Sequence, residues 1–358
     1  MSKINTLIEQ WIPAHIRKLS AYHVQDVGNA IKLDAMENPY TWDESLRTAW
    51  LQRLHEVTLA RYPDADASAV KAGLRQVMNI PENMDILLGN GSDEIIQMLA
   101  LCFNAEGRVL LVPEPSFVMY RLIGQAVGMR YLGVPLREGF ALDVPAMLQA
   151  IAEHNPALIF LASPNNPTGN AFALADILQI VEASRGVVVI DEAYIPFGAE
   201  SFMPHLEKYP NVLLMRTVSK LGLAGLRLGL LVAAPAWIAE IEKTRLPYNI
   251  NSLTQVSASF ALENFSVLQT QITQICKDRE LLSQALRALP NVQVWDSMAN
   301  FILFRVPDAP KAFAGLKAAN ILIKNLHGAH PMLENCLRVT IGTPEENRLF
   351  LTALEASL

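Results

Sequence analysis

Apolar runs of four to six residues recur between residues 85 and 233, and each run is followed by polar or small residues. The runs do not alternate between apolar and polar positions, so each one predicts a strand that is buried on both faces. Helical segments separate most of them. The predicted strands are residues 85–88, 108–112, 157–161, 187–190, 212–215 and 228–233.

Strands of this kind, separated by helices, predict an α/β fold with a mostly parallel sheet that is covered by helices on both faces. Ligands of such sheets bind outside the carboxyl ends of the strands. Most of the polar insertions lie at those ends. We therefore expect side chains that are far apart in the sequence to meet at one edge of the sheet.

The residues before the first predicted strand are less regular. Residues 1 to about 45 show no clear period, and we expect them to form an arm or a segment of a smaller domain. A helix is predicted from about residue 46 until Pro63 breaks it, and a second helix over residues 68–78.

After about residue 250 the pattern changes to longer helical runs and short strands, which is typical of a smaller α+β domain. Helices are predicted at residues 257–263 and 273–286, and strands at 292–295, 300–304 and 336–342. We therefore divide the chain into an N-terminal arm or small-domain segment (1–45), a large domain (46–250) and a small C-terminal domain (251–358).

Composition narrows the class of protein. The chain has 358 residues, of which 51% are hydrophobic and 18% charged, so a sizeable core is possible and disorder is not expected. The net charge of -6 and the lack of any Lys/Arg run argue against a nucleic-acid partner. Three scattered cysteines give neither a disulfide framework nor zinc spacing. Without a signal pattern or a membrane-spanning apolar run, a cytoplasmic protein is expected.

Lys220 is the most informative single residue. It follows the apolar run 212–215, where a lysine is unusual because burying its ammonium group is costly. Burial and a nearby cation such as Arg227 would lower the pKa of the amine, and a neutral amine can attack a carbonyl. A solvated lysine in a loop at the start of a helix explains this residue alone equally well.

Other strand ends carry residues that each allow a functional and a structural interpretation. Residues 89–94 (GNGSDE) can bind an anion at a helix N-terminus or form an ordinary turn, and Glu94 replaces the third glycine of a dinucleotide site. Asp191 can pair with a protonated ring nitrogen or cap a helix. Asn166 can donate to a ring hydroxyl or form a turn, and Phe117 can stack on a flat ring or lie in the core.

Together these parts match one cofactor. A reactive lysine, a carboxylate for a pyridinium nitrogen, a donor for a phenolate oxygen, an aromatic face and a phosphate cup describe a site for pyridoxal 5'-phosphate (PLP). Each signal is weak by itself, whereas their order along the chain is specific.

Over nearly its whole length the sequence resembles the fold-type I, class I/II aminotransferases, and within them the histidinol-phosphate subfamily. The motifs that carry the resemblance are Glu37-Asn38-Pro39, Arg61-Tyr62-Pro63-Asp64, residues 89–94, 163–169 and 191–194, Ser219-Lys220 with Gly225-Leu226-Arg227, and residues 337–342. The resemblance implies a large PLP-binding domain with a mostly parallel seven-stranded sheet between helices, plus a smaller α+β domain.

The resemblance also implies roles for the residues at the ring of the cofactor. Lys220 would bond to the cofactor aldehyde and later move a proton, and Asp191 would keep the pyridine nitrogen protonated. Tyr194 and Asn166 would bond the phenolate oxygen, with Asn166 also at the substrate. Phe117 would stack on the ring.

The resemblance places further residues at the phosphate and at the substrate. The phosphate group would be held by Ser92, Asp93, Ser219 and Arg227. Tyr62 would reach the cofactor phosphate of a second subunit, which requires a homodimer. Arg338 and Lys324 would bind the substrate anion, and Tyr22 would cover the substrate.

Two positions depart from the subfamily pattern. Phe117 stands where a tyrosine is common, and Lys324 stands where many members have an arginine. Compared with arginine, a lysine keeps the positive charge but cannot bind an anion through two parallel hydrogen bonds. Both departures bear on which amino donor the protein would use, and not on the type of reaction that the resemblance implies.

The implied reaction converts L-histidinol phosphate and 2-oxoglutarate to imidazole acetol phosphate and glutamate, in histidine biosynthesis. An aromatic amino acid aminotransferase and a phosphoamino-acid decarboxylase share the motifs. A non-catalytic effector-binding protein of the same fold is an alternative of another class, although the intact Lys220 and Asp191 argue against it. A nicotinamide-dependent dehydrogenase is a further alternative, which Glu94 disfavours.

Overall fold

A computed structural model of the chain describes residues 2–21 and 28–358. A seven-stranded sheet forms the centre of its larger part, in the order β2-β8-β7-β6-β5-β3-β4. All of these strands run parallel except β8, which is antiparallel to both of its neighbours. The strands are β2 (Asp85–Asn90), β3 (Val109–Glu114), β4 (Arg130–Pro135), β5 (Leu158–Ala162), β6 (Val187–Asp191), β7 (Val212–Thr217) and β8 (Leu228–Ala233).

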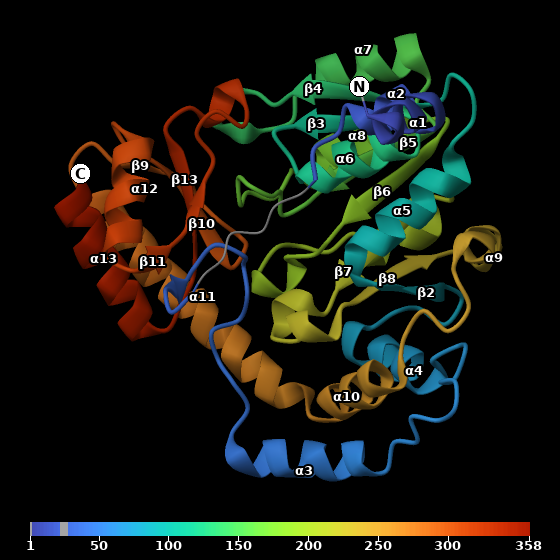
Figure 1. Cartoon of the computed structure of the whole chain (residues 1–358), viewed down its shortest axis with the longest axis horizontal. Coiled ribbons are helices and arrows are strands. Elements are labelled where there is room, and N and C mark those ends of the chain that lie inside the picture. The colour runs from blue at the N-terminus through green and yellow to red at the C-terminus, as the bar shows by residue number, and fades with distance from the viewer. Residues whose placement is uncertain (1, 22–27) are drawn as a thin grey trace.

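Helices cover both faces of this sheet, as the apolar runs predict (Figure 1). On one face α5, α6 and α9 bury their apolar side chains, and on the other α4, α7 and α8 do so. These helices are α4 (Ser68–Met78), α5 (Gly91–Phe103), α6 (Val118–Ala126), α7 (Val144–His154), α8 (Leu174–Ala183) and α9 (Pro235–Ile241). The prediction of a mostly parallel sheet between helices is thus confirmed.

The C-terminal part contains a four-stranded antiparallel sheet, β12-β13-β10-β9, and a parallel pair, β1-β11. In Figure 1 this part, in orange and red, lies beside the larger one, and the long helix α11 runs along both. Its strands are β1 (Ile31–Lys32), β9 (Gln293–Val294), β10 (Phe301–Arg305), β11 (Ile321–Leu322), β12 (Lys324–Asn325) and β13 (Cys336–Thr340). The remaining longer helices are α3 (Glu44–His55), α10 (Ser252–Glu263), α11 (Phe265–Ala288), α12 (Ala309–Ala318) and α13 (Pro344–Ser357).

Local features of the first 60 residues correct the expectation from sequence. Residues before 45 include two short helices, α1 (Lys3–Trp11) and α2 (Ala14–Arg17), besides β1. The α1 helix begins where Ser2 Oγ accepts a hydrogen bond from Asn5 N at 3.3 Å. The α3 helix ends at His55, well before Pro63. The division of the chain at residues 45 and 250 stays a prediction.

Among residues 2–21 and 28–358 no helix is long and apolar enough to cross a membrane. The two parts of the chain meet where the parallel strands end. The β1 segment pairs with β11 and then continues past the carboxyl ends of β6 and β7, so residues 33–38 lie between the large sheet and the C-terminal part. This arrangement positions the candidate site.

Candidate active site

A cavity of about 230 Å³ opens at the carboxyl ends of the parallel strands. Its walls come from the ends of β5, β6 and β7, from the first turn of α5 and from residues 35–37. The convergence that the sequence predicts is therefore present. The predicted residues that line the cavity are Ser92, Asp93, Phe117, Asn166, Asp191, Tyr194, Ser219, Lys220 and Arg227.

Lys220 lies in a short 3₁₀ turn (Ser219–Leu221) that directly follows β7. Its Nζ donates a hydrogen bond to the carbonyl oxygen of Ala35 at 3.3 Å and lies 5.7 Å from the centroid of the Tyr194 ring. Burial, reinforced by the positive charge of Arg338, lowers the pKa of the Lys220 amine from 10.5 to about 8. The lysine is thus a partly buried amine that loses its proton readily.

This pKa predicts a pH-dependent stability in the cofactor-free protein. Below about pH 8 the folded protein carries the full cost of a buried ammonium group. Between about pH 8 and 10.5 the unfolded chain binds the extra proton, so the free energy of unfolding is expected to rise with pH by roughly 2–3 kcal/mol from this residue. Denaturant unfolding of wild type and Lys220→Met at pH 7.5 and 9.5 measures the difference. A parallel pH dependence in both proteins would contradict the assignment.

Asp191 ends the buried strand β6 and is 5% exposed. Its Oδ2 accepts a hydrogen bond from the Tyr120 hydroxyl at 2.6 Å, and its Oδ1 accepts one from the backbone N–H of Ala193 at 2.9 Å. Burial raises the pKa of Asp191 from 3.8 to about 6, although the bond from Tyr120 opposes the shift. A cationic group in the cavity would stabilise the ionised form.

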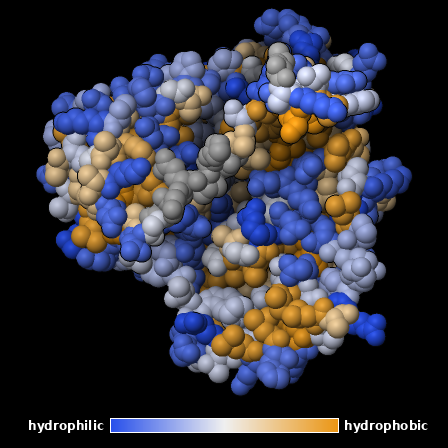
Figure 2. Space-filling model, viewed as in Figure 1, coloured by the Kyte–Doolittle hydropathy of each residue, from blue (hydrophilic) through white to orange (hydrophobic). Residues whose placement is uncertain are grey.

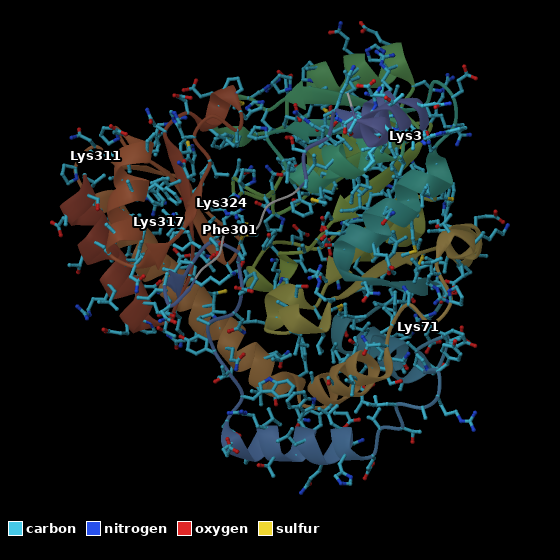
Figure 3. All side chains as sticks on the ribbon, in the orientation of Figure 1. Lys3, Lys71, Phe301, Lys311, Lys317 and Lys324 are labelled. Atoms are coloured by element: carbon cyan, nitrogen blue, oxygen red, sulfur yellow. The ribbon has the colours of Figure 1, made fainter. Side chains whose placement is uncertain are left out.

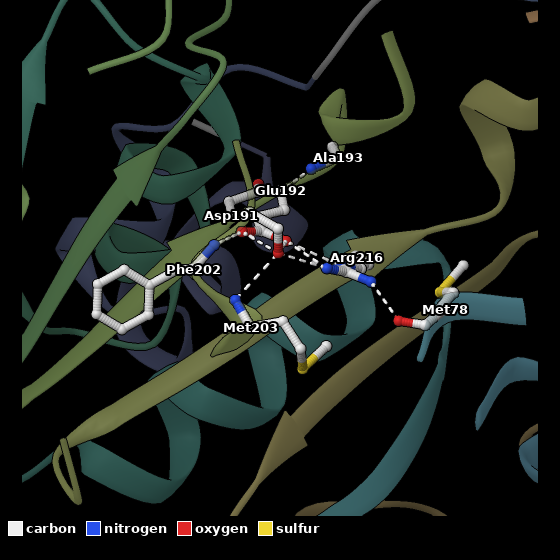
Figure 4. Close-up of polar contacts among 8 residues, drawn as sticks. Met78, Asp191, Glu192, Ala193, Phe202, Met203 and Arg216 are labelled. Atoms are coloured by element: carbon white, nitrogen blue, oxygen red, sulfur yellow. Dashed lines mark hydrogen bonds and ion pairs between the residues drawn. The ribbon is translucent and has the colours of Figure 1, made fainter. Parts of the chain in front are cut away.

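Glu192, next to Asp191, and Arg216, shortly before Lys220, form a buried ion pair (Figure 4). Glu192 Oε2 accepts hydrogen bonds from Arg216 Nε at 2.9 Å and Nη2 at 2.8 Å. The Glu192 side chain is 1% exposed, and its Oε1 accepts a further bond from Phe202 N at 2.5 Å. Because Glu192 follows Asp191 and Arg216 lies in the strand before Lys220, the pair fixes the ends of β6 and β7.

A second group of contacts joins the large sheet to the C-terminal part. Asn166 Nδ2 donates a hydrogen bond to the Tyr194 hydroxyl at 3.2 Å, and Asn166 Oδ1 accepts one from Arg338 Nη1. Arg338 Nη2 also donates to the carbonyl oxygen of Asp34 at 2.9 Å. Burial raises the pKa of Tyr194, against the effect of Arg338. The Tyr194 hydroxyl therefore stays a hydrogen-bond donor.

The start of α5 forms an end of the cavity that suits an anion. Gly91 has a φ of 75°, and a Cβ there would lie 2.6 Å from Arg227 Nη2, so only glycine allows the guanidinium to approach. Arg227 Nη2 lies 3.6 Å from Asp93 Oδ2. Burial raises the pKa of Asp93 despite this cation. Backbone N–H groups and the positive end of α5 add to the attraction of an anion.

A second cavity of about 360 Å³ adjoins the first and shares Met36, Phe117 and Asn166 with it. Arg338 and Lys324 line it from β13 and β12, where the two residues face each other in register. Burial, with the charge of Arg338, lowers the pKa of Lys324. Figure 3 labels Lys324 and Phe301 on the side of the C-terminal part that faces the large sheet. Two cations of the C-terminal part therefore line this cavity, together with Arg121, which pairs with Glu114.

Of the other predicted residues, Tyr62 lies away from both cavities and Tyr22 is not described. Tyr62 is 80% exposed and stacks on Tyr248, with ring centroids 4.5 Å apart, at a separate surface depression. Tyr22 lies outside the described residues. Within a single subunit, Tyr62 is therefore not brought to either cavity.

The sequence analysis assigned no role to several residues that line the first cavity, among them Ala35, Glu37 and Tyr120. Tyr120 lies one helical turn after Phe117, and this i, i+3 spacing could have placed it on the same face. Ala35 contributes a backbone carbonyl, which no sequence motif specifies.

This fold and this site define a class of protein. The pattern of the aminotransferase class I and II family matches residues 29–354, and the chain belongs to that family. A protein of Nitrosococcus oceani named histidinol-phosphate aminotransferase 2 is 56% identical over 98% of each chain. One of the same name from Cupriavidus pinatubonensis is 50% identical, covering 99% of this chain and 98% of that protein.

A solved structure shares the fold. It is the histidinol-phosphate aminotransferase from Sinorhizobium meliloti in complex with pyridoxal-5'-phosphate, with a TM-score of 0.86, 21% identity and 96% of each chain covered. At this identity the likeness concerns the fold.

Proposed function

We propose that the chain is a PLP-dependent aminotransferase that converts L-histidinol phosphate and 2-oxoglutarate to imidazole acetol phosphate and glutamate in histidine biosynthesis. The observation that carries the proposal is the pair of adjoining cavities: one presents Lys220 and Asp191, and the other presents Arg338 and Lys324. The relatives at 56% and 50% identity support the choice of amino donor.

The residues present fit PLP. A buried amine, a buried carboxylate and the cradle of Gly91 and Arg227 match the aldehyde, the pyridine nitrogen and the phosphate of the cofactor. When bound, the cofactor supplies an aldehyde that takes up the amino group and a ring that accepts electrons from the neighbouring carbon. The residues that would hold it are Ser92, Asp93, Phe117, Asn166, Asp191, Tyr194, Ser219, Lys220 and Arg227.

Lys220 and Asp191 would handle protons. Lys220, with a pKa of about 8, is partly neutral near physiological pH and can take a proton from the amine-bearing carbon of the substrate. Asp191 holds a proton at the pyridine nitrogen, because a buried carboxylate is stabilised by a cationic partner. Tyr194 and Asn166, which bond each other at 3.2 Å, present donors for the phenolate oxygen.

Arg338 and Lys324 would bind the anionic group of either substrate. The donor carries a phosphate, whereas 2-oxoglutarate carries two carboxylates. The guanidinium of Arg338 suits both geometries, and Lys324 adds a point charge. Arg338 lies on β13 and Lys324 on β12, and the pairing of these two strands brings both charges to one cavity.

An aromatic amino acid aminotransferase and a phosphoamino-acid decarboxylase remain the nearest alternatives, because the same two cavities could serve them. A non-catalytic effector-binding protein is less well supported, since it would not need the lowered pKa of Lys220. Steady-state rates with L-histidinol phosphate, phenylalanine and phosphothreonine test the choice. We expect kcat/KM to be largest for L-histidinol phosphate by at least roughly a hundredfold, as hydrogen-bonded recognition allows. A larger value for phenylalanine would refute the proposed donor.

The proposal includes a homodimer in which Tyr62 of one subunit reaches the cofactor phosphate of the other. Exposed apolar side chains around Tyr62 support it, and Figure 2 shows apolar surface gathered near α10. Those that line the same surface depression as Tyr62 are Leu59, Tyr248 and Leu253, each at least 42% exposed. Apolar surface of this extent is typical of an interface.

The role of Tyr62 predicts complementation between two inactive variants. In a mixed dimer of Lys220→Ala and Tyr62→Ala chains, one site has both Lys220 and a partner Tyr62, and the other has neither. Equimolar chains should therefore regain up to about a quarter of wild-type activity at limiting PLP, because half of the dimers carry one intact site of two. The activity of co-expressed, differently tagged chains measures this. No gain over the Tyr62→Ala homodimer would contradict the trans role.

A reducing, cytoplasmic location is also proposed. Its support is that Cys102, Cys276 and Cys336 are all free thiols, which suits a compartment that keeps thiols reduced.

A further inference from the structure

The second cavity carries one acidic side chain, which the proposed function does not use. Among the described residues that line this cavity, Glu114 is the sole carboxylate. It ends β3, next to the edge strand β4, and its side chain is 18% exposed. A largely buried carboxylate in this cavity requires an explanation.

Neighbouring side chains hold one oxygen of this carboxylate. Glu114 Oε1 accepts a hydrogen bond from the Tyr131 hydroxyl at 2.6 Å and another from Arg121 Nη2. The Arg121 guanidinium lies 5.0 Å from the centroid of the Tyr131 ring. Arg121 and Tyr131 thus fix the orientation of Glu114 from α6 and β4.

The other oxygen is left available. Glu114 Oε2 accepts no hydrogen bond from the described residues, and it is not sealed from solvent. It lies over Gly133, where any Cβ would overlap it. The absence of a side chain at Gly133 therefore makes room for the carboxylate.

One wall of the cavity carries two cations, and the other carries Glu114 together with its ion-pair partner Arg121. Arg338 and Lys324 come from the C-terminal sheet, whereas Glu114 comes from the large sheet. His330 also lines the cavity, but its Nδ1 accepts a hydrogen bond from Met332 N at 3.2 Å. The cavity suits a ligand with an anionic group at one end and a hydrogen-bond donor at the other.

We propose that Glu114 recognises the imidazole ring of histidinol phosphate by accepting a hydrogen bond from a ring N–H through Oε2. This inference rests on the proposed function. An imidazole ring always carries at least one N–H at neutral pH, whereas the rings of phenylalanine and tyrosine carry none. Placing the apolar ring of phenylalanine against Glu114 leaves Oε2 desolvated and without a donor, so the residue also selects against that substrate.

Two variants of Glu114 test the proposal. Glu114→Gln keeps the size of the side chain, but Arg121 and Tyr131 draw its carbonyl oxygen toward themselves. Glu114→Leu removes the acceptor. We expect kcat/KM for L-histidinol phosphate to fall roughly tenfold in Glu114→Gln and about a hundredfold in Glu114→Leu. The half-reaction with glutamate, which has no ring, should change less than about twofold.

Methylated substrates separate this role from a structural one. Two analogues of L-histidinol phosphate each carry a methyl group on one ring nitrogen. Wild type should discriminate against one of them by about tenfold or more, and Glu114→Leu should lose that discrimination while keeping a similar volume. Dissociation constants from calorimetry on the PLP-loaded Lys220→Ala protein, with and without Glu114→Leu, should show the same ratio.

Controls make the outcomes distinct. Glu138→Gln changes an exposed carboxylate outside both cavities and should alter no rate. Gly133→Ala keeps Glu114 but displaces its Oε2, and it should reproduce the loss. Unchanged discrimination in Glu114→Leu, with wild type active on L-histidinol phosphate, would overturn the role of Glu114 alone. Wild type without that activity would overturn the proposed function and this inference together.

Discussion

Replacing Lys220 with alanine is expected to lower turnover at least about ten-thousandfold, because the variant lacks both the covalent link to the cofactor and the group that moves the proton. Among the described residues that line the first cavity, no second amine can take over the role of Lys220. Within the described residues that line the first cavity, the other cationic side chain is Arg227, whose guanidinium is not an amine.

The loss should not reflect unfolding. Since the buried ammonium of Lys220 costs stability at neutral pH, the cofactor-free variant should be at least as stable as wild type. Lys220→Arg keeps the charge and should be equally inactive. Lys71→Ala, on the surface helix α4 (Figure 3), serves as the matched control with wild-type rates. Activity of Lys220→Ala within tenfold of wild type would contradict the mechanism.

The second large effect is expected for Asp191→Asn, with kcat lower by about a hundred- to ten-thousandfold. A neutral amide cannot hold a proton at the pyridine nitrogen as a carboxylate does, so the ring would accept electrons less well. The side chain keeps its size and its bond from Ala193 N. Stopped-flow rates of the half-reaction with L-histidinol phosphate measure this effect directly.

Although Asp191→Asn should lower kcat, it should stabilise the cofactor-free fold. The folded pKa of Asp191, about 6, exceeds its usual 3.8, so the folded state binds more protons between these values and its stability falls as pH rises. Above about pH 6 the cost of the buried carboxylate is roughly 3 kcal/mol. Asp191→Asn should therefore unfold at higher denaturant concentration than wild type at pH 8, with the gain shrinking toward pH 4.

Asp278→Asn is a matched control for the stopped-flow half-reaction and for the unfolding experiment. Asp278 is a buried aspartate on α11 that also accepts a hydrogen bond from a tyrosine, Tyr40, at 3.0 Å. It does not line either cavity. Its substitution should leave the half-reaction near the wild-type rate. An equal loss of kcat in both variants would contradict a specific role for Asp191.

The sequence predicted the sheet well, because parallel strands buried on both faces read as unbroken apolar runs. The edge strand β4 was missed, since Gly133 and the terminal Pro135 interrupt its pattern. The α1 helix was missed although Ile4, Leu7, Ile8 and Trp11 recur at helical spacing, and this apolar face stays exposed in the structure.

The site was predictable where it depends on strand ends, as for Asp191 and Lys220. The parts of the site that other elements contribute from distant positions in the chain were not predictable. Tyr120 bonds Asp191, 71 residues away, and Arg121 and Tyr131 orient Glu114. Such partners depend on how α6 and β4 pack, which local sequence patterns do not encode. Tyr62, which is exposed in the single chain, would reach a site only in the proposed homodimer.

The most direct test is the absorption spectrum of the purified protein, before and after addition of L-histidinol phosphate without any keto acid. We predict a band of lysine-bound PLP that disappears as the aminated form of the cofactor accumulates. A band that responds only to phenylalanine or tyrosine would contradict the proposed donor. If no band forms after addition of PLP, the assignment of the cavity as a cofactor site is wrong.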